Sequence, residues 1–219
     1  LATRLVALQS MALDELPKKF HGKTHVIYQS AEAVRAKAKN LNHVFNVCVI
    51  GHLRDEKDPL RTAIAVRNLP QQSRIVVTHV GEALDRRIAR IAKAEVKRNP
   101  RYRWIGQLSH RQTRQLLAQS NLVAITSKME GSSNVLSEAL ASGVPVVATK
   151  ISGLMGTLGK RFIGYYPTGD TDRLQRLLLR AENDGKFYRE LKRQCRSFAR
   201  LVRPERERSA WRRLLKEIA

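Results

Sequence analysis

From residue 45 onward, short apolar runs alternate with segments that have helical spacing. The apolar runs are 45–50, 73–80, 102–105, 121–126 and 144–148, and the helical segments between them are 59–69, 82–98, 110–119 and 132–141. The runs are apolar throughout, which is typical of strands in a parallel sheet that helices cover on both faces. The sequence therefore predicts an α/β fold with a doubly wound parallel sheet, for which 3-2-1-4-5 is a common strand order.

The two ends of the chain do not fit this single unit. Residues 1–30 contain a strand-like stretch at 5–9, a helix-like stretch at 11–16 and a short apolar run at 25–29, and we expect the tail of another domain and a linker there. After Asp170 the pattern is helical, over 171–183, 186–202 and 205–218. The chain begins with Leu1 rather than Met, so we expect it to be a piece of a longer protein.

The net charge is strongly positive. The sequence has 41 Lys and Arg against 19 Asp and Glu, a net charge of +22, which attracts nucleic acid, phosphorylated small molecules and acidic membrane surfaces. Aromatic residues make up only 5% of the chain and form no run that would stack bases, which disfavours nucleic acid. Contact with a membrane surface stays open, although no apolar run approaches the ~18 residues of a transmembrane helix.

The cysteines point to a reducing compartment. The chain has only Cys48 and Cys195, too few for a disulfide framework, and Cys48 lies in an apolar run where core packing is expected. We therefore predict a cytoplasmic protein.

The predicted topology places a ligand site before any motif is considered. In an open α/β sheet, ligands bind beyond the carboxyl ends of the strands, where the strand order reverses. With the order 3-2-1-4-5, that crevice lies between the first and fourth strands, and the segments that follow them are 51–58 and 127–133. These segments also carry the densest polar chemistry of the chain.

The second segment leads into the helix predicted at 132–141. Gly131 would let a ligand approach the backbone closely, and Ser132 or Ser133 is suited to cap the helix, whose free N–H groups favour phosphate. Glu130 and Glu138 could flank the phosphate and accept hydrogen bonds from hydroxyl groups, as a ribose–diphosphate–sugar requires. Taken singly, Glu130 could instead be a first-turn residue that interacts with the helix dipole, and Glu138 a solvated helix residue.

The first segment offers positive charge. Gly51 ends the first strand, and Arg54 and Lys57 could direct charge into the crevice, Arg as a fork and Lys as a point charge. A solvated charged turn is the alternative for this segment. His52 could be a base, a phosphate donor or an ordinary histidine at the end of a strand.

Several other kinds of site are disfavoured. The six histidines are scattered, and no His or Cys spacing resembles a zinc site. The G-x-S-x-G elbow of hydrolases and the Walker motif are absent too. We expect neither a metal nor a cofactor.

At these residues the sequence resembles the retaining GT-B glycosyltransferases of family four. The stretch EGSSNVLSEALASGVPVVAT resembles their E-x7-E signature and the strand that follows it, and the likeness runs from about Phe45 to Ala219. GHLRDEK is similar to the phosphate-binding loop of the family, with His52 where arginine is usual and Lys57 at the lysine. The run from Trp104 to Leu108 resembles the loop that contacts the base through main-chain atoms.

The resemblance implies a role for each residue. Glu138 would bind the ribose, Glu130 would contact the donor sugar, and Lys57 with the amides from Gly131 to Val135 would stabilise the departing diphosphate, so that transfer needs no metal. Glu130 and Lys57 would be the catalytic residues. The implied donor, a nucleoside-diphosphate sugar taken to be a UDP-sugar, would bind to Gly51, His52, Arg54, Lys57, Ile105, Leu108, Glu130, Gly131, Ser132, Ser133, Asn134, Val135 and Glu138.

The resemblance also implies a division into domains. Residues 1–30 would be the tail of the N-terminal acceptor domain, 31–200 the donor-binding domain, and 201–219, with Trp211, a helix that returns toward the N-terminal domain. The chain alone would then be inactive. A narrower resemblance rests on Tyr28-Gln-Ser30, GHLRDEKDP, KMEGSSNVLSEAL and the run from Gly164 to Asp170. These stretches look like the branch that contains bacterial selenosugar synthase, which implies an anionic acceptor, although that branch has Gly-Gly-Ala where this chain has Gly131-Ser-Ser133.

Two other functions remain as alternatives. A GT-B sugar-nucleotide isomerase would share the fold and the nucleotide site, but needs catalytic acids in the cleft between its domains. A basic RNA-binding α/β module would need only the surface charge, and would bind any polyanion in a strongly salt-dependent way.

Overall fold

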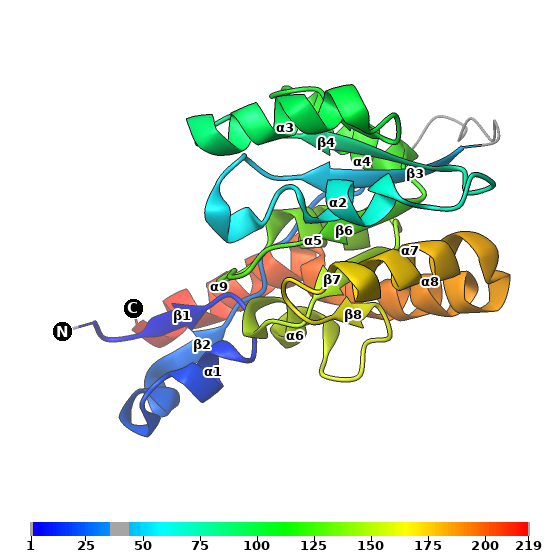
Figure 1. The fold of residues 1–219 in the computed structure, drawn as a ribbon. Coiled ribbons are helices and arrows are strands. Elements are labelled where there is room, and N and C mark those ends of the chain that lie inside the picture. Colours follow the sequence, from blue (N-terminus) through cyan, green and yellow to red (C-terminus); the bar gives the residue numbers. More distant parts are fainter. Residues whose placement is uncertain (1, 36–43, 219) are drawn as a thin grey trace.

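The fold is built on a six-stranded, all-parallel sheet, seen in the computed structural model, which describes residues 2–35 and 44–218 (Figure 1). The strand order is β5-β4-β3-β6-β7-β8, which confirms the predicted doubly wound sheet and adds a sixth strand at its edge. The bounds are β3 (Phe45–Ile50), β4 (Ile75–Val80), β5 (Tyr102–Trp104), β6 (Leu122–Ile125), β7 (Val146–Thr149) and β8 (Tyr165–Tyr166).

Helices cover both faces of the sheet. α2 and α7 contact each other on one face, whereas α4 and α5 contact each other on the opposite face (Figure 1). The chain reverses direction across the sheet after β5, which is why the crossover helices change face there. The bounds are α2 (Arg61–Arg67), α3 (Arg86–Arg98), α4 (His110–Gln119), α5 (Asn134–Ala141), α6 (Ser152–Leu158), α7 (Thr171–Asn183), α8 (Gly185–Ala199) and α9 (Pro204–Ile218).

Capping residues set helix starts that the apolar pattern alone placed too early. The side chain of Asp85 accepts hydrogen bonds from the first turn of α3, so the helix expected from residue 82 begins at Arg86. Ser133 caps α5 in the same way, through Leu136 N, and α5 therefore begins two residues after the predicted start.

The sequence pattern missed α6 and β8. α6 has the sequence SGLMGTL, in which two glycines and a threonine give a low helix propensity. Its glycines are there for packing, since a Cβ on Gly156 would lie 1.7 Å from Gln9 Oε1. β8 has only two residues, too few to show a period.

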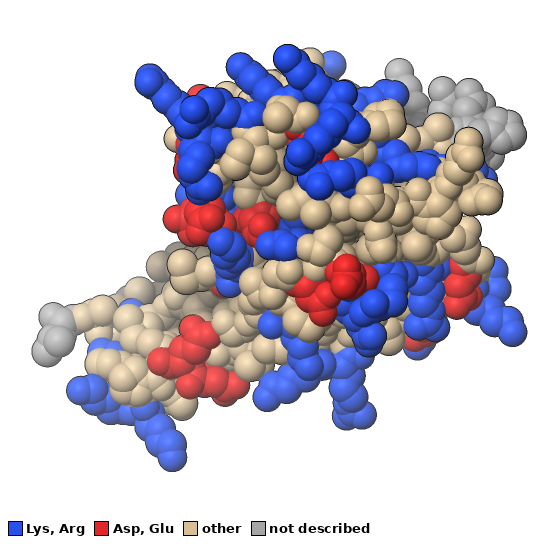
Figure 2. All heavy atoms as spheres, viewed as in Figure 1, with Lys and Arg blue, Asp and Glu red and all other residues tan. Residues whose placement is uncertain are grey.

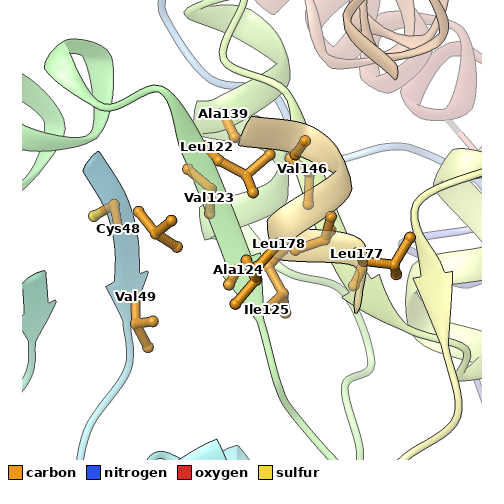
Figure 3. Close-up of a cluster of buried hydrophobic side chains, with 14 of the residues drawn as sticks. Cys48, Val49, Leu122, Val123, Ala124, Ile125, Ala139, Val146, Leu177 and Leu178 are labelled. Carbon is orange, nitrogen blue, oxygen red and sulfur yellow. The ribbon is translucent and has the colours of Figure 1, made fainter. Parts of the chain in front are cut away.

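The hydrophobic core lies between the sheet and its helices. Figure 3 shows part of it, where side chains of β3, β6 and β7 lie beside Leu177 and Leu178 of α7. Cys48 is fully buried among them, as predicted. Burial raises the pKa of the Cys48 thiol to about 12, so this thiol is held in its neutral form.

Residues 2–30 form a small unit of their own beside the sheet. β1 (Leu5–Ala7) pairs in parallel with β2 (Thr24–Val26), and α1 (Ala12–Glu15) and η1 (Lys18–Lys23) lie between them. The unit contacts α6 through Ser10 Oγ and Tyr28 Oη, which both donate to Gly156 O. α9 reaches it through Glu217, which is 3.5 Å from His25 Nε2. The predicted domain boundaries stay predictions, and of the range 31–200 the residues 36–43 lie outside the described structure.

None of the helices in the described ranges is long and apolar enough to span a membrane.

Candidate functional site

A cleft of about 470 Å³ opens at the carboxyl ends of the central strands, where the topology predicts it. The loops after β3, β4 and β5 and the first turns of α4 and α5 form its walls. Eight predicted residues line it, namely Gly51, His52, Arg54, Lys57, Leu108, Asn134, Val135 and Glu138. Six others that the sequence did not single out do so too, namely Ile50, Val80, Gly81, Gln107, His110 and Thr113.

The floor of the cleft is a buried polar contact between β3 and β4. His79 is fully buried, and its Nε2 donates to Gly51 O at 2.9 Å while Tyr102 Oη donates to its Nδ1 at 2.7 Å. Burial lowers the pKa of His79 to about 4, against the smaller opposing effect of the Gly51 carbonyl, so the ring is neutral. Gly81 also lines the cleft and packs directly against this contact, because a Cβ there would lie 1.9 Å from Gly51 O.

One ion pair joins the two loops that the topology predicted to meet. Lys57 Nζ donates to Glu130 Oε1 at 2.6 Å, and Ser127 Oγ donates to the same oxygen at 2.7 Å. Thr126 Oγ1 donates to Lys57 O at 2.8 Å, which fixes the backbone below the pair. The side chains of Lys57 and Glu130 are 20% and 9% exposed, so the pair is largely shielded from water.

Two glycines next to this pair differ in what surrounds them. A Cβ on Gly153, at the start of α6, would lie 1.8 Å from Glu130 O, so the helix packs directly against the backbone of the site. A Cβ on Gly131 would meet nothing within 4 Å. The space beside Gly131 is therefore open, as the prediction of a close ligand approach requires, whereas Gly153 is needed for the fold itself.

Glu138 also lines the cleft and has a partner that the sequence did not reveal. His110 Nε2 donates to Glu138 Oε1 at 2.8 Å. The two residues are 28 positions apart and come from α4 and α5, so no sequence spacing links them. Asn134 and Val135 are the first residues of α5, where the N–H groups of a helix lack acceptors within the helix.

Some predicted residues lie elsewhere. Ile105 is 43% exposed and lies outside the cleft lining, as do Gly131 and Ser132. The Ser133 hydroxyl is buried and serves as the cap of α5, as predicted for Ser132 or Ser133. Glu130 reaches the cleft through Lys57 rather than lining it. The role of each residue toward a ligand stays a prediction.

The two remaining residues of the first loop are held loosely. His52 Nδ1 accepts from Glu82 N at 3.1 Å, and Arg54 lies 3.9 Å from Glu56 in an exposed pair. The Arg54 side chain is half exposed and has room to turn toward a ligand. Across the described part of the chain, no group of three or more His, Cys, Asp or Glu residues could hold a metal ion.

Solved structures with the same fold place the chain among known proteins. It is similar to the Anabaena protein HepE in complex with UDP, with a TM-score of 0.81 and 18% identity over 99% of this chain and 64% of that one. HepE in complex with UDP and glucose gives a TM-score of 0.81 and 20% identity over 99% of this chain and 63% of that one. Sucrose-phosphate synthase from Thermosynechococcus elongatus gives 0.83 and 20%, over 100% of this chain and 59% of that one.

The chain thus spans less than two thirds of the length of these proteins. No curated protein sequence matches it. The family described as "Glycosyl transferases group 1" matches residues 30–200, most of the chain. The chain belongs to the glycosyl transferases group 1 family.

Proposed function

We propose that this chain binds the donor, a UDP-sugar, for a retaining glycosyltransferase that works without a metal ion. The observation that carries the proposal is the cleft itself, which brings Lys57, the first turn of α5 and Glu138 together around one cavity. Its volume of about 470 Å³ is in the range of small-molecule sites. HepE, which shares the fold, is described in complex with UDP and with UDP-glucose, and this supports the choice of base.

The cleft offers a partner for each part of such a donor. Glu138 can accept hydrogen bonds from the two ribose hydroxyls. One of these hydroxyls would replace His110 as the donor to Glu138 Oε1. The first N–H groups of α5 and the ammonium group of Lys57 can bind the diphosphate. Arg54, which is loosely held, can add its guanidinium and so supply the charge that His52 does not.

Lys57 and Glu130 would then act at the bond between the sugar and the diphosphate. When the sugar leaves the diphosphate, negative charge grows on the leaving oxygen, and a fixed cation nearby stabilises that charge. Lys57 is fixed by Glu130, whose own oxygen is held by Ser127. Cations and helix N–H groups supply the positive charge that a metal would otherwise bring, which is why we propose a metal-independent reaction. Glu130 would contact the sugar with its second oxygen.

The acceptor would bind outside this half. The chain spans about 64% of the length of HepE, and we propose that an N-terminal domain of the same protein supplies the acceptor site. The small unit of β1 and β2 against α6 and α9 is where such a domain would continue. A net charge of +22 suits an anionic acceptor. The two buried thiols agree with a cytoplasmic location.

Calorimetric titration with UDP, UMP, ADP, GDP and a short mixed-sequence RNA tests the proposal. We expect UDP to bind more tightly than UMP and the other diphosphates, with modest salt dependence. The Glu138→Ala variant should bind UDP about tenfold more weakly, because hydrogen bonds to a charged group contribute roughly 1.5 kcal/mol or more. Glu205→Ala, the same change on the exposed face of α9, is the matched control and should bind like the wild type.

Two results would count against the proposal. Equal affinity for all nucleotides, with RNA bound tightly and lost steeply as salt rises, would show that surface charge alone binds ligands. An unchanged UDP affinity in Glu138→Ala would remove the ribose contact from the assigned site.

A further inference from the structure

A second cavity of about 530 Å³ lies at the β8 edge of the sheet, apart from the cleft and with no lining residue in common with it. Its walls come from the ends of β7 and β8, the loop between α6 and β8, and the start of α7. Figure 2 shows Lys and Arg side chains projecting below this part of the molecule. The cavity has five cations in its lining, Lys150, Lys160, Arg161, Arg173 and Arg176.

The loop that carries two of these cations is held in place. Phe162 is buried and packs edge-on against Tyr165, with ring centroids 5.1 Å apart. Ile163 N donates to Gln194 Oε1 at 3.1 Å, and a Cβ on Gly164 would lie 2.7 Å from Val146 O. Lys160 and Arg161 precede this fixed stretch directly. The backbone that follows these two cations is therefore fixed by packing and by a hydrogen bond.

The five positive charges in this cavity face only one carboxylate. Within the ranges that the structure describes, none of the five cations forms an ion pair, although they share one cavity. Asp170 is the single carboxylate in the lining, and its Oδ1 accepts from Arg173 N as the cap of α7. Like charges held together repel each other, and an anion bound between them would relieve the repulsion.

One residue of the cavity lining, Tyr165, carries an unsatisfied hydroxyl. Tyr165 Oη is buried and has no hydrogen-bond partner in the described structure. A buried polar atom without a partner costs free energy, and most such atoms in folded proteins have a partner. Burial also raises the pKa of Tyr165, so the hydroxyl keeps its proton and remains a hydrogen-bond donor.

We propose that this cavity binds a small anion with more than one phosphate group, held by the five cations and by the Tyr165 hydroxyl. A phosphate group accepts several hydrogen bonds at once, which suits ammonium and guanidinium groups arranged around a common space. The volume fits a small molecule. A compact ligand can enter the cavity beside Tyr165, whereas a polymer lying across the surface would contact only the exposed cations.

The first test is calorimetric titration of inorganic pyrophosphate into the chain with UDP present in excess. We expect one pyrophosphate to bind without displacing UDP. The double variant K160A/R161A should bind it about thirtyfold more weakly, since each lost charged contact amounts to a factor of several. R86A/R90A removes the same charge from the exposed face of α3 and is the matched control, with unchanged pyrophosphate affinity expected.

The Tyr165→Phe variant tests the hydroxyl by itself. It should fold at least as stably as the wild type, because it removes an unsatisfied polar atom, and should bind pyrophosphate about fivefold more weakly. Unchanged pyrophosphate affinity in Tyr165→Phe would overturn the proposal, as would an equal loss in both double variants, which would reflect general charge attraction.

Two further outcomes also decide against this site. Competition between pyrophosphate and UDP would place the anion in the cleft instead. Tight binding to RNA or to vesicles containing an anionic lipid, weakened by K160A/R161A while pyrophosphate fails to bind, would assign the cations to a surface contact. If UDP itself fails to bind, the proposed function fails, but the pyrophosphate result still stands on its own.

Discussion

The cleft and the cavity at β8 (the pocket of Lys150, Lys160, Arg161, Arg173 and Arg176) both contain several cations, but the cations are paired with carboxylates only around the cleft. At the cleft, Lys57 pairs with Glu130, and on the neighbouring loops Arg61 pairs with Asp58 and Lys128 with Asp55. None of the five cations of the β8 cavity forms an ion pair with another described residue.

The difference separates two uses of a cation. The paired cations of the cleft join one loop to another and therefore belong to the fold as well as to the site. The unpaired cations of the β8 cavity repel each other and cannot stabilise the folded chain by their charge. Substitutions in the cleft should therefore lower stability and ligand binding together, whereas substitutions in the β8 cavity should change binding alone.

The largest effect is expected from Gly153→Ala. The new Cβ would overlap with Glu130 O, so α6 and the Glu130 loop must move apart, at a cost of about 4 kcal/mol in the free energy of unfolding. UDP binding should be lost with it. Gly131→Ala is the control, since its Cβ meets open space, and should change the free energy of unfolding by less than about 0.5 kcal/mol. Urea unfolding of both variants measures this, and similar losses in the two would contradict the packing described for Gly153.

The second largest effect is expected from acid, which should lower the free energy of unfolding by protonating His79. The folded chain keeps His79 neutral because its pKa is lowered to about 4, whereas in the unfolded chain the ring takes up a proton near 6.5. The stabilising contribution is thus complete above pH 6.5 and is lost as the pH falls toward 4. The pKa difference corresponds to about 3 kcal/mol.

Urea unfolding between pH 7 and pH 4, compared with a His79→Gln variant, isolates this contribution. Glu95 adds a separate loss at lower pH. Burial raises its pKa, but hydrogen bonds from Arg67, Arg98 and Asn99 outweigh burial and lower the pKa to about 2. Its stabilising contribution is therefore lost only as the pH falls from about 4.5. If the free energy of unfolding of His79→Gln depends on pH between 7 and 4 as that of the wild type does, His79 is not the group that titrates.

The smallest of the three effects is expected at the ion pair itself. Lys57→Ala leaves Glu130 shielded from water without its cation, which should lower the free energy of unfolding by about 2 kcal/mol. The double variant Lys57→Ala/Glu130→Ala should recover part of this loss, because it removes the unpaired charge as well. Lys160→Ala in the β8 cavity is the control and should leave stability unchanged or slightly raised. Additive losses in the cycle would mean that the two residues do not stabilise each other.

The sequence predicted the sheet and the cleft better than it predicted their details. The parallel sheet follows from the continuous apolar runs, and the meeting of the loops at Lys57 and Glu130 follows once the common strand order is assumed. The capping role of Ser133 was also within reach, because capping depends on neighbouring residues alone. The N-terminal strand pair was read only as scattered strand-like pieces, since three residues are too short to show a period.

What the sequence by itself determined is local, namely which segments are strands or helices and which polar residues follow each strand. Only the tertiary structure showed that Gly153 packs against Glu130, that His110 reaches Glu138, and that His79 supports Gly51. The physical reason is that these contacts join residues from separate elements, 23 to 28 positions apart. A repeating pattern reports the face of one element, but a contact between two elements depends on how their backbones approach each other, and no spacing along the chain records that approach.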